Sequence, residues 1–181
     1  EQRRRALVIL STVVVLAIIG GVIAVVALNH KHKNSTVTTN QATVDTVMQK
    51  VASVPASTLD TVGTGSAVAG PQAVSGVTAA STPLTGPGGK PQLLYIGAEF
   101  CPYCAAERWA MGVALSRFGT LSGTSFTASS ANDVNPNTST LDFKDTTYSS
   151  KYLDFQPYEA EDRSDPPKPL QKVPTSANTL W

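Results

Sequence analysis

Two cysteines separated by two residues lie between an apolar run and a helix-forming segment, and this arrangement constrains the fold more than any other feature. The run Gln92–Gly97 (QLLYIG) is bounded by turn-forming residues and predicts a short buried strand. Good helix formers fill residues 102–118, and Gly119 stands where such a helix would stop. The CPYC motif at residues 101–104 therefore occupies the junction of a strand and a helix.

The position of the two cysteines indicates redox chemistry. Cys101 is expected at the helix N-terminus, where unpaired backbone N–H groups and the helix dipole favour a thiolate, the attacking species. Cys104, one turn further on, is placed to close a disulfide and release a bound substrate. Pro102 suits the first helical turn because it needs no hydrogen-bond donor there. We assign Cys101 as the nucleophile and Cys104 as the resolving thiol.

Three other uses of the cysteine pair compete with this assignment. A structural zinc site needs four ligands, and the sequence has no second cysteine pair and no histidine near this segment. A c-type haem attachment needs a histidine directly after the second cysteine, where Ala105 stands. An inert disulfide stays open as an alternative, although so short a loop restrains the unfolded chain little. We therefore expect no metal and no cofactor.

Charged side chains flank the motif. Either Glu99 or Glu107 could carry protons to Cys104 or raise the pKa of a thiol by repulsion. The simpler interpretation places both carboxylates in solvent, with Arg108 as a partner on the helix surface. Few charges interrupt the helical segment, so we expect it to be largely buried, with Trp109 in the core.

A long apolar run near the N-terminus predicts a membrane anchor. Residues 6–28 carry no charge and are long enough to span a bilayer at about 1.5 Å per residue. The run exceeds the roughly 7–15 apolar residues of a signal peptide, so we expect an uncleaved helix. Three arginines at 3–5 against two lysines, at 31 and 33, favour a cytoplasmic N-terminus and an extracytoplasmic main domain in the cell membrane. Gly20-Gly21 forms a small-residue notch for close helix contact.

The remaining sequence divides by composition. We expect a cytoplasmic basic flank at 1–5, the transmembrane helix at 6–28, a juxtamembrane spacer at 29–43, a folded domain at 44–159 and an extended, proline- and charge-rich segment at 160–181. The net charge of +1 argues against nucleic acid as a partner, since phosphate binding needs a concentrated basic surface.

Within the folded domain, apolar residues at helical spacing over 44–54 predict a helix that Thr43 would cap. Short strands are expected at 73–78, 125–129 and 140–143. The aromatic residues spread over 148–158 predict an extended segment that packs its rings on a core.

The strand, the CPYC motif and the helix together resemble the thioredoxin superfamily, with a glutaredoxin-like centre. Phe100 stands where thioredoxins usually carry tryptophan. The longer string YIGAEFCPYCAAERWA, followed by LSRFGT and YSSKYLDF, is similar to a narrower group of membrane-anchored thioredoxin-like proteins of actinobacteria, a family of unknown function. The resemblance runs from about Val44 to Glu159. It implies an α/β, thioredoxin-like domain behind a single transmembrane helix.

The resemblance also implies a cis-proline loop facing the cysteines, followed by a hairpin and a last helix. Val173-Pro174 is the nearest candidate for this loop, but only seven residues follow it. Asn135-Pro136 comes too early and lies in a turn-like context. We therefore expect the thioredoxin-like domain to be incomplete at its C-terminus.

Two functions fit these features. The first is a membrane-anchored, extracytoplasmic thiol–disulfide oxidoreductase that acts on protein thiols and disulfides through Cys101 and Cys104. The second is a non-catalytic accessory subunit of a larger membrane complex. The bacterial setting implied by the resemblance makes a respiratory-chain assembly the expected partner in that case.

Overall fold

The computed structural model describes residues 34–35, 37, 40–63 and 84–178. The expected membrane anchor at 6–28 and the expected strand at 73–78 lie outside these residues. No helix in the described ranges has the length and apolar character needed to cross a membrane.

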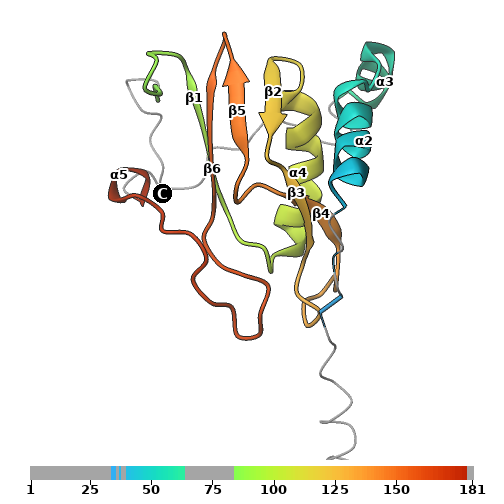
Figure 1. The fold of residues 1–181 in the computed structure, drawn as a ribbon, viewed down its shortest axis with the longest axis vertical. Coiled ribbons are helices and arrows are strands. Elements are labelled where there is room, and N and C mark those ends of the chain that lie inside the picture. The colour runs from blue at the N-terminus through green and yellow to red at the C-terminus, as the bar shows by residue number, and fades with distance from the viewer. Residues whose placement is uncertain (1–33, 36, 38–39, 64–83, 179–181) are drawn as a thin grey trace, which may run out of the picture. The chain divides into compact units, whose positions relative to one another are not determined.

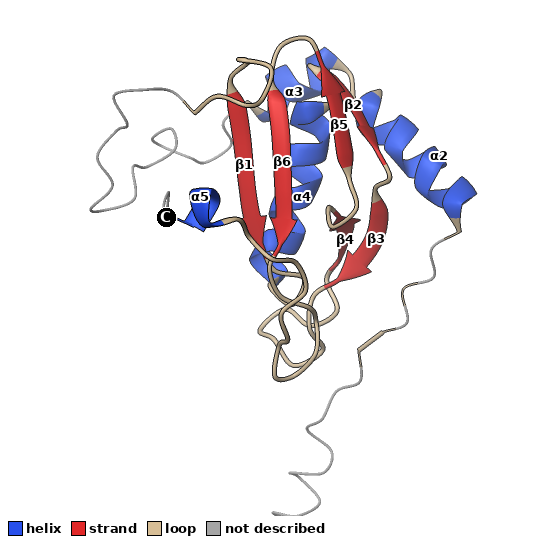
Figure 2. Ribbon diagram, turned by 60° about the vertical axis from the view of Figure 1, so that its left-hand side comes forward, coloured by secondary structure: helices blue, strands red, loops and turns tan. Residues whose placement is uncertain are grey.

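The described residues form a mixed α/β fold (Figure 1). Its elements, in chain order, are α2 (Gln41–Ala52), α3 (Ala56–Val62), β1 (Gln92–Gly97), α4 (Pro102–Leu115), β2 (Gly119–Ser122), β3 (Ser125–Ala128), β4 (Ser139–Asp142), β5 (Thr147–Ser150), β6 (Asp154–Glu159) and α5 (Thr175–Asn178). The strands pair in three two-stranded ladders, β1 with β6, β2 with β5 and β3 with β4. Figure 2 shows β5 beside β6 and α4 behind the strands.

The parallel pair β1–β6 positions the cysteines. Its register runs from Gln92 opposite Asp154 to Gly97 opposite Glu159. Because the two strands are parallel, their carboxyl ends lie at the same end of the domain, where the chain enters α4 (Figure 2). The other two ladders are antiparallel and lie in the chain between α4 and β6. The CPYC motif therefore sits at the carboxyl edge of a β–α–β unit.

The core is built from leucines and from aromatic rings that pack edge to face. Its buried members are Tyr95, Leu115, Leu141, Phe143 and Phe155. The rings of Tyr95 and Phe143, and those of Phe143 and Phe155, lie 5.5 Å apart with interplanar angles of 87° and 83°. Edge-to-face pairs at this separation add stability beyond the area that they bury. The strands of the segment 148–158 supply Phe155 to this core, as the aromatic spacing predicts.

Several strand predictions are confirmed, but the predicted start of α2 is wrong. Strand β1 has the predicted bounds, and β3 and β4 fall within a residue of the strands expected at 125–129 and 140–143. Helix α2 begins at Gln41 rather than after Thr43, because the Asn40 side chain accepts a hydrogen bond from Ala42 N at 3.0 Å. Asparagine is among the strongest N-cap residues, which explains the earlier start.

Helix α4 is less buried than its composition predicts, and it ends at Leu115 rather than Phe118. Its buried stripe consists of Pro102, Ala105, Arg108, Gly112 and Leu115. The opposite face, which carries Tyr103, Glu107 and several alanines, is exposed. Alanine tolerates either environment, so the apolar composition of the helix did not reveal this division.

Two residues on α4 show how closely it packs against β4. A Cβ at Gly112 would lie 2.8 Å from Leu141 Cδ1, so glycine allows the close approach of helix and strand. Trp109 is half-buried rather than fully in the core, and its indole Nε1 donates to Ser139 O at 3.1 Å.

The chain beyond β6 returns to the domain. Leu170 N donates to Ala160 O at 2.8 Å, and Glu161 and Pro169 form an isolated bridge. Within this loop, the peptide bond between Asp165 and Pro166 is cis. Val173-Pro174, the nearest candidate in the sequence for a cis-proline loop, is not a cis bond.

Candidate functional site

The two cysteines meet at the first turn of α4. Cys101 is the N-cap residue, with extended backbone angles (φ −76°, ψ 120°), and Pro102 takes the first helical position. The Cys101 sulfur accepts a hydrogen bond from the backbone N–H of Cys104, with Sγ and N 3.3 Å apart. Both residues are half-buried, and neither is in a disulfide. The structure thus brings together the two residues that the sequence assigns to the site.

The environment of Cys104 differs from that of a surface thiol. Burial raises the pKa of the Cys104 thiol, and a hydrogen bond from the Ala98 backbone partly opposes this rise. The neighbouring Cys101 raises the pKa further, whereas the charge of Arg108 lowers it. Cys104 therefore holds its proton more firmly than an ordinary cysteine, which suits a thiol that reacts second.

The loop between β1 and α4 is held by its own turn and by two distant segments. Its backbone hydrogen bonds run from Cys101 N to Ala98 O (3.2 Å), from Glu99 N to Glu161 O (2.9 Å) and from Ser130 N to Phe100 O (2.9 Å). The loop after β3 and the loop after β6 therefore fix the approach of the chain to Cys101. Backbone groups that are paired in this way leave little freedom for the loop to shift.

Directly beneath this loop lies a fully buried ion pair that sequence reasoning missed. Arg108 Nε donates to Glu159 Oε1 at 2.8 Å, and Arg108 Nη2 donates to Glu159 Oε2 at 2.6 Å. Both side chains have zero exposure, so the prediction of a surface Arg108 is wrong. Burial alone would lower the pKa of the guanidinium, but the hydrogen bonds and charge of Glu159 outweigh it and raise the pKa.

This ion pair connects three parts of the site. Arg108 belongs to α4 and Glu159 ends β6, so the pair joins the helix to the strand. Arg108 Nη2 also donates to Ala98 O at 2.9 Å, the same carbonyl that accepts from Cys101 N. The guanidinium therefore braces the turn that presents Cys101.

Polar atoms without a hydrogen-bond partner adjoin the ion pair. Among the described residues, the Tyr95 hydroxyl and Arg108 Nη1 are buried and unpaired. The guanidinium carbon lies 5.9 Å from the centre of the Tyr95 ring. Burial raises the pKa of the Tyr95 hydroxyl well above its usual range, with the charges of Glu159 and Cys104 adding to the rise, so Tyr95 stays neutral. Cys104 thus lies close to a small, buried polar cluster.

The two carboxylates beside the motif have different environments. Glu107 is exposed, as predicted, but Glu99 is half-buried. Burial raises the pKa of Glu99 from its ordinary value of 4.5 to about 7, and the charges of Asp142 and Glu159 add to this effect. Glu99 therefore changes its charge near neutral pH, two residues before Cys101.

The Glu99 carboxyl predicts a specific pH dependence of stability. Its pKa is higher in the folded than in the unfolded state, so its contribution is fully present below about pH 4.5 and is lost as the pH rises through about 7. We expect the wild type to lose stability relative to Glu99→Gln between pH 5 and pH 8 in urea unfolding. Glu107→Gln, which alters an exposed carboxylate, is the control and should follow the wild type at every pH. Parallel curves for the wild type and Glu99→Gln would show that Glu99 titrates normally.

No group of three or more His, Cys, Asp or Glu side chains in the described ranges is arranged to hold a metal ion.

The fold and the site define a mixed α/β domain with a CxxC motif at the N-terminus of a helix. The chain belongs to the family described as Domain of unknown function (DUF929), whose model matches residues 77–180, more than half of the chain. No curated protein and no solved structure matches the chain. The family description assigns no activity, so function is argued from the site.

Proposed function

We propose that this protein is a thiol–disulfide oxidoreductase of the thioredoxin-like type. The observation that carries the proposal is the hydrogen bond from Cys104 N–H to the Cys101 sulfur at the start of α4. A negative sulfur at this position gains both the hydrogen bond and the favourable end of the helix dipole. The β1–α4–β6 unit, with the cysteines at the carboxyl end of β1, supports the thioredoxin-like part of the proposal.

The location of the protein is part of the same proposal. The uncharged run at 6–28, with arginines before it, supports a single-pass anchor in the cell membrane. The catalytic domain would then lie outside the cytoplasm, where disulfides form and persist. Its partners would be the thiols and disulfides of exported or membrane proteins.

The reaction proceeds in two exchange steps. The Cys101 thiolate attacks one sulfur of a client disulfide, a Cys101–client S–S bond forms, and the other client sulfur leaves as a thiolate and takes up a proton. Cys104 then loses its proton and attacks Cys101 Sγ. The Cys101–Cys104 disulfide forms, and the first client sulfur leaves as the second thiol. The client gains two electrons and two protons, and the CPYC pair loses them.

The reverse sequence oxidises a client dithiol. Either direction needs a further dithiol reductant or disulfide oxidant to reset the CPYC pair between turnovers. The reduction potential of the pair decides the direction.

The buried cluster contributes to the second step. Cys104 must lose a proton before it attacks, and burial opposes this loss. The Arg108 charge beneath the motif lowers the pKa of the Cys104 thiol and so favours the thiolate as it forms. Because Arg108 is held by Glu159 and Ala98, its charge is already in place before the reaction.

Reaction with glutathione disulfide tests the proposal on the full chain in detergent. We expect the reduced wild type to end with a Cys101–Cys104 disulfide and no bound glutathione. Cys104→Ser should retain one glutathione on Cys101. Cys101→Ser should react at least about 10-fold more slowly, because its remaining thiol is half-buried and has a raised pKa. Mass spectrometry distinguishes these products. Equal rates for the two single variants would contradict the roles assigned to Cys101 and Cys104. A wild type that never closes its disulfide would contradict the proposed function.

A further inference from the structure

A groove beside Cys101 has no role in the exchange steps described above. Its volume is about 210 Å³, and its lining includes Phe100, Ser130, Asp133, Ser164, Asp165 and Pro167. Phe100 is the residue directly before Cys101, so the groove borders the chain segment that carries the attacking sulfur. Pockets for small organic ligands usually measure about 300–1,000 Å³, so this groove is nearer the size of a single side chain.

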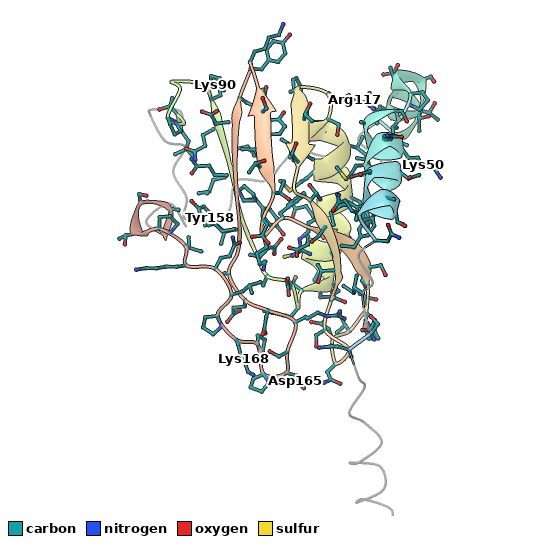
Figure 3. All side chains as sticks on the ribbon, in the orientation of Figure 1. Lys50, Lys90, Arg117, Tyr158, Asp165 and Lys168 are labelled. Carbon is teal, nitrogen blue, oxygen red and sulfur yellow. The ribbon has the colours of Figure 1, made fainter. Side chains whose placement is uncertain are left out.

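Three separate segments build the groove and are bonded to one another. The chain before α4 supplies Phe100, the loop after β3 supplies Ser130 and Asp133, and the loop after β6 supplies the remainder. Ser130 N donates to Phe100 O at 2.9 Å, and Asn132 Nδ2 donates to Asp165 Oδ2 at 2.8 Å. Figure 3 shows Asp165 on the loop after β6, at the end of the domain where α4 begins. The groove is thus a fixed feature of the surface around the CPYC motif.

The groove is acidic. Asp133 and Asp165 line it, and no basic residue does. Neither carboxylate is in a salt bridge within the described residues. The nearby Arg163 donates to Ser35 O, Ser129 O and Asn137 Oδ1, each at 3.0 Å, and it forms no salt bridge with either carboxylate within the described residues. The lining of the groove therefore carries a net negative charge.

Apolar surface accompanies the charge. Phe100 and Pro167 give the groove apolar walls. Tyr103 within the motif is 70% exposed, and Val134 next to Asp133 is 71% exposed. An extended peptide laid over Cys101 would contact such apolar groups through its own side chains, as peptide-binding surfaces commonly do.

We propose that the groove selects client segments that carry a lysine or arginine close to their reactive cysteine. The proposal rests on the proposed function and specifies its substrate class. A client sulfur must reach Cys101, which brings the residues that flank it close to the groove next to Phe100. A long cationic side chain fits both the volume and the charge of the groove, and its stem can lie against Phe100 and Pro167.

Two chromogenic peptides test this selectivity on the full-length protein in detergent. Each peptide carries one cysteine as a mixed disulfide with 5-thio-2-nitrobenzoate, and the two differ only in a lysine or a glutamate two residues from the cysteine. Attack of Cys101 on the peptide sulfur releases the coloured thiolate. We expect the lysine peptide to react about 10-fold faster at low salt, and this ratio to fall as salt screens the charges.

Asp133→Asn/Asp165→Asn is the informative variant. It should bring the rate ratio close to 1 while the rate with uncharged bis(2-hydroxyethyl) disulfide stays near that of the wild type. Asp60→Asn/Asp145→Asn removes the same charge from exposed positions on α3 and before β5, and it should retain the lysine preference. Because Asp165 also accepts from Asn132, Asp133→Lys is a second variant, and it should shift the preference towards the glutamate peptide.

The outcomes separate the two proposals. A wild type that reacts equally with both peptides, or a preference that survives in Asp133→Asn/Asp165→Asn, overturns the charge selectivity and leaves the oxidoreductase intact. A wild type that reacts neither with the peptides nor with bis(2-hydroxyethyl) disulfide overturns both proposals.

Discussion

Replacing Arg108 by methionine is expected to lower the free energy of unfolding by about 3–5 kcal/mol. The change leaves the Glu159 carboxylate with zero exposure and without its bidentate partner. It also removes the donor to Ala98 O, the carbonyl that accepts from Cys101 N. Methionine fills much of the same volume, so the lost charge rather than a cavity accounts for the effect. Urea unfolding of the full chain measures it.

A double variant separates the charge effect from other damage. Arg108→Met/Glu159→Met removes both charges together, and it should recover most of the stability, because paired buried charges often exchange for apolar residues at little cost. Arg117→Met is the matched control, since this exposed arginine follows the same helix and its side chain donates to Val54 O. Its effect should stay within about 1 kcal/mol. An Arg108→Met variant that matches the control would show that the pair does not hold the site together.

The local part of the site could be predicted from the sequence because its signals are local. The strand β1, the N-cap position of Cys101 and the start of α4 at Pro102 depend on residues that lie within a few positions of one another. Capping and apolar runs act at this range. The strands β3 and β4 were predicted for the same reason.

The partners of the site could not be predicted in this way. Arg108 and Glu159 are separated by 51 positions, and nothing local marks the arginine as buried. The spacing of the stripe Ala105, Arg108 and Gly112 on α4 is the one signal that could have indicated it. The acidic groove likewise needs the contact between Phe100 and Ser130, which depends on the tertiary fold.

Replacing Cys104 by alanine is expected to make mixed disulfides between Cys101 and its clients accumulate, because the change blocks the step that releases the client. Cys101 keeps its position at the start of α4, and its hydrogen bond comes from the backbone N–H of residue 104 rather than from the thiol. Alanine at this position therefore preserves the first exchange step. We expect mixed disulfides with clients to rise about 10-fold or more above the wild-type level, since no second thiol resolves them.

Trapping these mixed disulfides in the native membrane tests the central claim most directly. Full-length Cys104→Ala is expressed in its own membrane, free thiols are blocked by alkylation, and the covalent partners are identified by mass spectrometry. Cys101→Ser/Cys104→Ala is the matched control, since it lacks both thiols on the same scaffold. The account predicts recurrent protein adducts that are bound through Cys101, are released by a reductant and are absent from the control. Cys104→Ala that carries no adducts, and instead co-purifies in stoichiometric amounts with a membrane complex, would contradict it and identify an accessory subunit with an idle cysteine pair.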